Sequence, residues 1–212
     1  MSAAMRDGHS TAGTLGIGLG AIRRLADFSD LYSTPGHGTV LVARFWPVPS
    51  EYKIRCAGLV RPISGEAECG DTFGAIRADD TVTVVLADGL GHGPLAAAAS
   101  AEAMAAVLAG PAASPAALLE RAHRRMSGTR GGAVGIVQVC GQVARFAGLG
   151  NVAAFILSSA GRKSMLSVPG IAGYQARTFR QFDYEVPPGA AVILHSDGIS
   201  SRWDAGVVVL TP

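Results

Sequence analysis

The segment from Thr81 to Ala106 constrains the fold more than any other part of the chain. A β-branched, apolar run, Thr81–Val85, leads into the glycine-rich sequence LADGLGHG at 86–93, and an alanine-rich stretch, Pro94–Ala106, follows. This order predicts a buried strand, a tight turn with one carboxylate, Asp88, and then a helix. Glycines beside a carboxylate let backbone carbonyls approach a hard cation such as Mg²⁺ or Mn²⁺. Asp-Gly is also a common turn dipeptide, so the motif alone leaves both interpretations open.

Two further aspartates lie at comparable places in the sequence. Asp71 follows Gly70 and opens another apolar–polar alternation, and Asp197 follows the apolar run Ala190–Leu194. Three carboxylates at neighbouring strand ends repel one another unless a cation joins them. The pattern favours a site for two metal ions if the three strand ends meet in space.

Three motifs resemble a known family in their order and spacing. They are Gly70-Asp71, ADGLGHG at 87–93 and SDG at 196–198, and Asn151 fits the same family's middle strands. The chain is similar here to the metal-dependent PPM-type serine/threonine phosphatases, in particular to their SpoIIE/RsbX-like bacterial branch. The resemblance implies a PPM/SpoIIE-like phosphatase domain over 52–212, shortened at its C-terminus. The implied fold is α+β, a layered α/β-β/α sandwich.

The resemblance also implies roles for particular residues. Asp88 is expected to be the central catalytic residue, bridging two Mn²⁺ or Mg²⁺ ions. Asp71 and the Gly89 carbonyl would hold one ion, and Asp197 would hold the other. Asp204 either replaces the family's last metal carboxylate or ends the segment that follows the SDG motif at 196–198.

The implied activity is that of a metal-dependent protein phosphatase acting on phosphoserine or phosphothreonine. Metal-activated water would remove phosphate from a regulatory protein of the anti-sigma-antagonist or stressosome type. The alternative is a catalytically impaired regulatory module that binds such partners.

The first fifty residues carry a different pattern. A glycine-rich stretch, 7–20, leads into the helix-like stretch 21–26, and strand-like runs follow near 30–33 and 39–45. Alternating glycines before a helix can surround phosphate with backbone amides, although such a loop is more often a turn. Residues 1–47 resemble the C-terminal part of a GHKL (histidine-kinase-like, anti-sigma type) ATPase domain, a partial α/β segment. Because that family's adenine-recognising residues precede the resemblance, an ATP-dependent kinase is disfavoured.

Composition narrows the classes of partner. A net charge of +2 over 212 residues gives no reason to expect nucleic acid or a polybasic membrane contact. Cys56, Cys69 and Cys140 are odd in number and lack CxxC spacing, which predicts buried, reduced thiols. The N-terminal residues show no secretory signal, and the apolar window 94–110 is too short to span a bilayer. We therefore expect a cytoplasmic protein without a membrane partner.

Four polar residues near the motifs need separate treatment. His92 is either a general acid or a structural residue of its Gly-x-Gly turn, and the second role is the more common. His195 either contacts the site or points into the core. Arg130 either meets substrate phosphate or is a solvated loop arginine. Ser196 lacks the Gly-x-Ser-x-Gly elbow of a nucleophile, so no covalent enzyme intermediate is expected.

Periodicity and turn signals predict the secondary structure. Ser114 is expected to cap a helix that has Pro115 at its first position. The predicted helices cover 19–28, 94–108 and 115–126. The predicted strands lie near 30–33, 39–45, 53–60, 71–77, 81–88, 134–139, 143–149, 153–158, 181–185 and 190–196.

Overall fold

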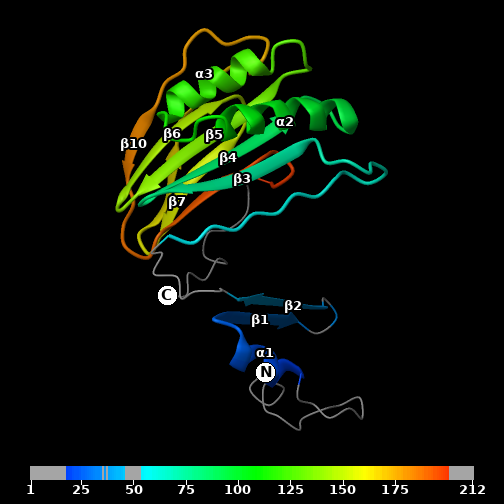
Figure 1. Cartoon of the computed structure of the whole chain (residues 1–212), viewed down its shortest axis with the longest axis vertical. Coiled ribbons are helices and arrows are strands. Elements are labelled where there is room, and N and C mark those ends of the chain that lie inside the picture. The colour runs from blue at the N-terminus through cyan, green and yellow to red at the C-terminus, as the bar shows by residue number, and fades with distance from the viewer. Residues whose placement is uncertain (1–17, 35, 37, 46–53, 201–212) are drawn as a thin grey trace. The chain divides into compact units, whose positions relative to one another are not determined.

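The computed structural model describes residues 18–34, 36, 38–45 and 54–200, and the chain divides into two compact units, 1–55 and 56–212 (Figure 1). The first unit contains α1 (Gly18–Leu25) and the antiparallel hairpin β1 (Phe28–Thr34) and β2 (Gly38–Arg44). The predicted helix over 19–28 ends early, at Leu25, because Phe28 already pairs with Arg44 across the hairpin. The glycines before residue 18 and Asp204 lie outside the described residues.

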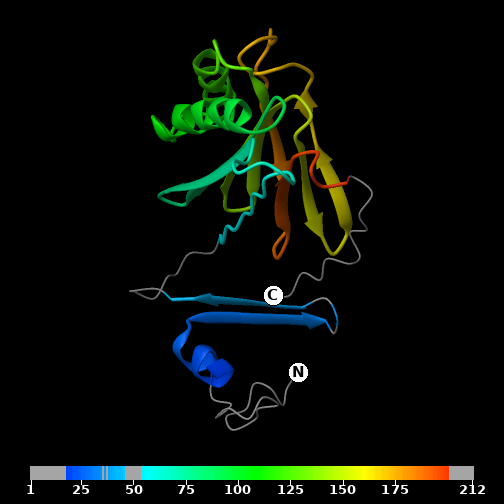
Figure 2. The ribbon, with the colours of Figure 1, turned by 90° about the vertical axis from the view of Figure 1, so that its right-hand side faces the viewer.

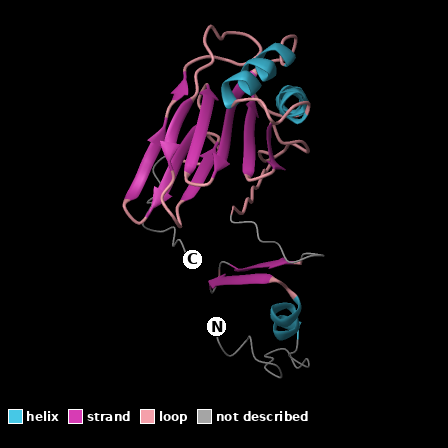
Figure 3. Ribbon diagram, turned by 60° about the vertical axis from the view of Figure 1, so that its left-hand side comes forward, coloured by secondary structure: helices cyan, strands magenta, loops and turns pink. Residues whose placement is uncertain are grey.

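The second unit contains two sheets. The larger sheet has the order β10 (Phe182–Glu185), β6 (Val143–Leu149), β5 (Gly132–Cys140), β4 (Thr81–Gly89) and β3 (Asp71–Ala78), and β9 (Ser167–Val168) pairs in parallel with β6. The smaller sheet has the order β11 (Ala191–His195), β7 (Ala153–Ser158) and β8 (Gly161–Met165). Helices α2 (Pro94–Leu108) and α3 (Pro115–Arg125) cover the face of the larger sheet that is turned away from the smaller one (Figures 2 and 3).

Small side chains let α2 lie close to the larger sheet. Its buried alanines recur at spacings of three and four residues and are fully covered: Ala96, Ala99, Ala103 and Ala106. The α3 helix begins as the sequence predicts, because the Ser114 hydroxyl accepts a hydrogen bond from Ala117 N at 3.4 Å and Pro115 follows. Leu118 and Leu119 of α3 complete this core.

A second, smaller core lies between the two sheets. Leu86 of β4 and Val152 are buried there, and Phe73 of β3 and Leu194 of β11 pack against them. Val85 and Ala87, the neighbours of Leu86, belong instead to the core under the helices. The strands of the larger sheet therefore present alternate residues to the helices and to the smaller sheet.

Three predictions about this unit need correction. Residues 54–60 form no strand, and β8 and β9 form where no strand was predicted. None of the three cysteines forms a disulfide, but Cys56 and Cys140 are exposed and Cys69 is half-buried, where buried thiols were predicted. Over the described ranges, no helix is both long and apolar enough to cross a membrane.

Candidate metal centre

Two carboxylates face each other on adjacent strands of the larger sheet. Asp71 is the first residue of β3, Asp88 is the last but one of β4, and the antiparallel register pairs them directly. Asp71 lies two positions before Phe73, and Asp88 two positions after Leu86, and both of these apolar residues pack between the sheets. Because residues two apart share one face of a strand, both aspartates belong to the face that meets the smaller sheet.

The third carboxylate comes from the smaller sheet. Asp197 follows the end of β11, and its Oδ2 accepts a hydrogen bond from Asn151 Nδ2 at 3.2 Å. The residue before it, Ser196, donates its hydroxyl to Asp71 Oδ2 at 2.7 Å. This bond links the end of β11 to the start of β3, so the three aspartates gather at one end of the sandwich.

Crowding of negative charge is evident in the electrostatics of Asp88. The pKa of Asp88 is raised to about 7, chiefly by burial and then by the charges of Asp71 and Asp197 and a hydrogen bond with the Asp71 carboxyl. Over residues 54–200, no Lys or Arg forms an ion pair with any of the three. Uncompensated carboxylates are hard oxygen donors, and they suit a divalent cation such as Mg²⁺ or Mn²⁺.

The turn after Asp88 packs tightly against its neighbours. Gly89 N donates to Gly70 O at 3.1 Å, which holds the turn against the residue before Asp71. A Cβ atom on Gly89 would overlap the backbone of Ala96, so glycine alone fits at this contact with α2. In the part of the chain that is described, no group of three His, Cys, Asp or Glu side chains is arranged to hold a metal ion. The packing of this turn fixes the backbone of Gly89 next to Asp88.

His92 contacts the carboxylate of Glu66, a residue that the sequence motifs do not include. Its Nδ1 lies 2.6 Å from Glu66 Oε1, and its side chain is 68% exposed. Glu66 belongs to the loop before β3, and its carboxylate lies against Gly93, the residue that precedes α2. The contact therefore ties this loop to the start of α2, which is a structural role for His92. Glu66 lies in a loop without a recognisable motif, so only the folded structure brings the two together.

His195 points into the protein. It is 5% exposed, its Nδ1 lies 2.7 Å from the Ser196 carbonyl oxygen, and its ring meets the edge of Phe155 at 5.9 Å between centroids. Its Nε2 has no hydrogen-bond partner among the described residues. Of the two interpretations of His195, the structure supports the core position.

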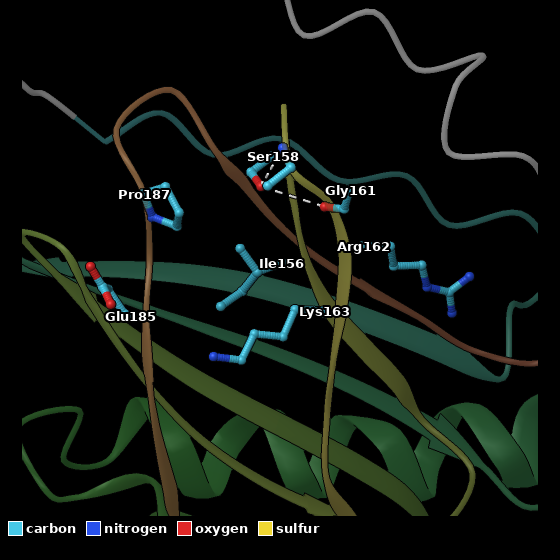
Figure 4. Close-up of a pocket in the computed structure, with 8 residues that line it drawn as sticks. Ile156, Ser158, Gly161, Arg162, Lys163, Glu185 and Pro187 are labelled. Atoms are coloured by element: carbon cyan, nitrogen blue, oxygen red, sulfur yellow. Dashed lines mark hydrogen bonds between the residues drawn. The ribbon is translucent and has the colours of Figure 1, made fainter.

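A pocket of about 270 Å³ lies at the opposite end of the sandwich (Figure 4). Ser158 and Gly161, at the turn between β7 and β8, are part of its lining, and the Ser158 hydroxyl donates to the Gly161 carbonyl at 3.5 Å. β7 begins at Ala153, which pairs with His195 near Asp197, and ends at Ser158. The pocket and the aspartates therefore lie at opposite ends of the same strand. The lining residues are Ile156, Ser158, Ala160, Gly161, Arg162, Lys163, Glu185 and Pro187.

Comparison with known proteins identifies the family. The profile of the family described as "Stage II sporulation protein E (SpoIIE)" matches residues 78–207. The phosphoserine phosphatase RsbX of Bacillus subtilis (strain 168) is 30% identical over 142 residues, which cover 64% of this chain and 70% of RsbX. The chain belongs to the SpoIIE family of PPM-type phosphatases.

Solved structures agree with this assignment. A structure described under "The bacterial stressosome: a modular system that has been adapted to control secondary messenger signaling" is 30% identical, with a TM-score of 0.64 over 68% of this chain and 77% of that one. A crystal structure of RsbX in complex with magnesium is 23% identical and has a TM-score of 0.65. The match covers 70% of this chain and 76% of the RsbX chain. The S. agalactiae serine/threonine phosphatase has a TM-score of 0.60 at 15% identity. The match covers 73% of this chain and 84% of that phosphatase. The predicted α+β fold of the PPM type is confirmed.

Proposed function

We propose that this chain is a metal-dependent protein phosphatase that hydrolyses phosphoserine or phosphothreonine. The observation that carries the proposal is the gathering of Asp71, Asp88 and Asp197 at one end of the sandwich, with negative charge that no Lys or Arg of residues 54–200 neutralises through an ion pair. The likeness to phosphoserine phosphatase RsbX supports the reaction, and the RsbX structure with magnesium supports a divalent cofactor.

Each proposed ligand has a defined place in the fold. The charges of both other aspartates raise the pKa of Asp88, so Asp88 lies close enough to each to be the carboxylate shared by two Mg²⁺ or Mn²⁺ ions. Asp71 and the Gly89 carbonyl would hold one ion, and Asp197 would hold the other. When bound, such ions lower the pKa of water and neutralise charge on phosphoryl oxygens.

Two polar residues position these ligands. The Ser196 hydroxyl donates to Asp71, and the Asn151 amide donates to Asp197. Hydrogen bonds of this kind fix the orientation of metal-binding carboxylates. Because its hydroxyl is bonded to a carboxylate of the centre, Ser196 is a positioning residue, which supports direct hydrolysis without a phosphorylated enzyme serine.

The substrate and the domain boundaries are part of the proposal. We infer a phosphorylated regulatory protein of the anti-sigma-antagonist or stressosome type, which the likeness to RsbX and to the stressosome structure supports. The phosphatase domain would cover 52–212, and 1–47 would be the C-terminal part of a GHKL ATPase domain.

A direct assay tests the proposal. The full chain is incubated with a phosphoserine peptide in Mn²⁺, in Mg²⁺ and in excess EDTA, and released phosphate is measured. Hydrolysis that requires the cation is expected. Binding of a phosphorylated regulatory protein without hydrolysis in either metal would support the impaired regulatory module instead.

A further inference from the structure

Arg130 lies directly beside the turn that carries the proposed metal ligands. Leu90 N donates to the Gly131 carbonyl at 2.9 Å, so the residues before β5 run alongside this turn. A Cβ atom on Gly91 would lie 2.9 Å from Arg130 Nη1, and the guanidinium therefore lies over Gly91. Gly91 is only three positions after Asp88.

The guanidinium is available to an external anion. Arg130 is exposed and makes no ion pair with any described carboxylate. The nearby Glu66 carboxylate is bonded to His92 instead. The Thr129 hydroxyl donates to the Met126 carbonyl at 2.7 Å and accepts from Gly131 N at 3.0 Å, so the backbone on both sides of Arg130 is held. A guanidinium on a fixed backbone, with no ion-pair partner among the described residues, suits a phosphate group, which it can bind through two parallel hydrogen bonds.

The charge balance of the centre also favours a cation at this place. Three carboxylates with two divalent cations have one net positive charge, whereas a phosphoserine side chain carries nearly two negative charges at neutral pH. The Arg130 guanidinium would supply the second positive charge.

Leu90 gives the same edge of the site an apolar contact. It lies between Gly89 and Gly91, and it is 53% exposed although its backbone is hydrogen-bonded. Single exposed leucines are ordinary on protein surfaces. This one, however, directly follows a proposed metal ligand and lies beside the Arg130 loop. A substrate that continues past its phosphoserine, as a protein does, can reach it.

We propose that Arg130 and Leu90 together form a substrate-recognition rim. Arg130 binds the phosphoryl group, and Leu90 contacts an apolar side chain next to the phosphoserine. The rim rests on the proposed function and makes it more specific, because it selects a phosphoserine in a protein segment with an apolar neighbour over free phosphoserine.

The test uses the full chain in Mg²⁺ and four variants: Arg130→Ala, Arg130→Lys, Leu90→Ala and Arg124→Ala. Arg124 is the matched control, since it is an exposed arginine on α3 that forms an ion pair with Glu120 one turn away. Titration calorimetry measures the affinity for inorganic phosphate. Steady-state assays give KM and kcat for free phosphoserine and for two peptides, with Leu or Ser beside the phosphoserine. Thermal unfolding checks that each variant folds.

Distinct changes are expected from the two rim residues. Arg130→Ala should weaken phosphate binding and raise KM for all three substrates on the order of tenfold, since a charged hydrogen-bonded contact is lost. Arg130→Lys should recover part of the binding through its charge. Leu90→Ala should raise KM severalfold for the Leu peptide alone, and Arg124→Ala should match the wild type.

Two results would overturn the rim. If Arg130→Ala keeps its phosphate affinity and KM within twofold of the wild type, Arg130 is not part of the rim. If Leu90→Ala affects both peptides equally, Leu90 is not part of it. Failure of the proposed function looks different. In that case the wild type releases no phosphate in any metal, yet an arginine-dependent phosphate affinity in calorimetry still supports the rim.

Discussion

The two ends of the sandwich in residues 56–212 are built from the same strands but differ in their charges. At one end, the three aspartates of the centre have like charge and no described ion-pair partner. Toward the other end, charges of both signs occur together: Lys163 and Glu185 line the pocket, and Arg145 pairs with Asp183 at 3.8 Å. The first end gathers charge of one sign, which an added cation would neutralise, whereas the second carries charges of both signs.

This difference shows how a binding site is distinguished from ordinary surface. Exposed pairs of opposite charge contribute about 0–1 kcal/mol, and they leave little for a ligand to gain. Like carboxylates held together by a sheet register raise the free energy of the folded chain until a cation binds them. The pocket at the other end therefore says less about function than the gathered negative charge.

The largest effect is expected from neutralising a carboxylate at the aspartate end, compared with one at the pocket end. Asp88→Asn removes the one carboxylate suited to both ions, and it should lower metal-dependent turnover by a factor on the order of 10³. Glu185→Gln is the matched control at the pocket end and should leave turnover unchanged. Steady-state hydrolysis of a phosphoserine peptide measures both. Similar rates in the two variants would contradict the claim that the aspartate end carries the reaction and the pocket end does not.

A smaller effect is expected at His92. Its exposed contact with Glu66 is structural, so His92→Ala should reduce kcat by less than about tenfold, whereas loss of a general acid removes about 10²–10⁴. Glu66→Gln should give a similar small loss, because both changes break the same contact. If His92→Ala alone were as inactive as Asp88→Asn, with its fold intact, His92 would belong to the chemistry.

The crowding of charge at Asp88 should also be visible in the pH dependence of thermal stability, a measurement that needs no substrate. Its pKa is raised from 3.8 to about 7 in the folded chain, so the folded state binds this proton more tightly than the unfolded state. The resulting stabilisation is complete below about pH 4 and is lost as the pH rises through 7. In EDTA, the Tm of the wild type should therefore fall between pH 5 and pH 8 relative to that of Asp88→Asn. Saturating Mg²⁺ should remove this difference in slope, and parallel pH profiles in EDTA would contradict the account.

The smallest effect is expected from ATP. The stretch 1–47 resembles the C-terminal part of an ATPase domain and holds none of that family's adenine-recognising residues, so by itself it would not orient a nucleotide's base. We expect no ATP binding tighter than about millimolar, which corresponds to about 4 kcal/mol. A micromolar Kd in titration calorimetry would show that the N-terminal unit is a nucleotide site in its own right.

Much of the second unit could be predicted because local signals agree with its packing. The α2 helix has the predicted bounds, and Ser114 caps α3 as expected. The strand predicted over 53–60 was wrong in its described part because apolar–polar alternation cannot show whether a partner strand is present. β8 was missed for the opposite reason: its polar sequence, Gly161–Met165, is a strand only because β7 lies beside it.

The candidate site divides in the same way. Short motifs drew attention to Asp71, Asp88 and Asp197, whose placement at one end of the sandwich supports their predicted role. Their supporting contacts are long-range, and no local pattern indicates them. Ser196 reaches Asp71 across 125 positions of sequence, and Glu66 reaches His92 across 26. Such contacts depend on how the two sheets and the loop before β3 come together.

Calorimetric titration of Mg²⁺ and Mn²⁺ tests the central claim most directly. The wild type and Glu185→Gln should bind up to two ions with the same affinity, and Asp88→Asn should lose most of this binding because the bridging carboxylate is gone. Absence of binding to the wild type at millimolar concentrations, or equal binding by Asp88→Asn, would contradict a metal centre at this end of the sandwich.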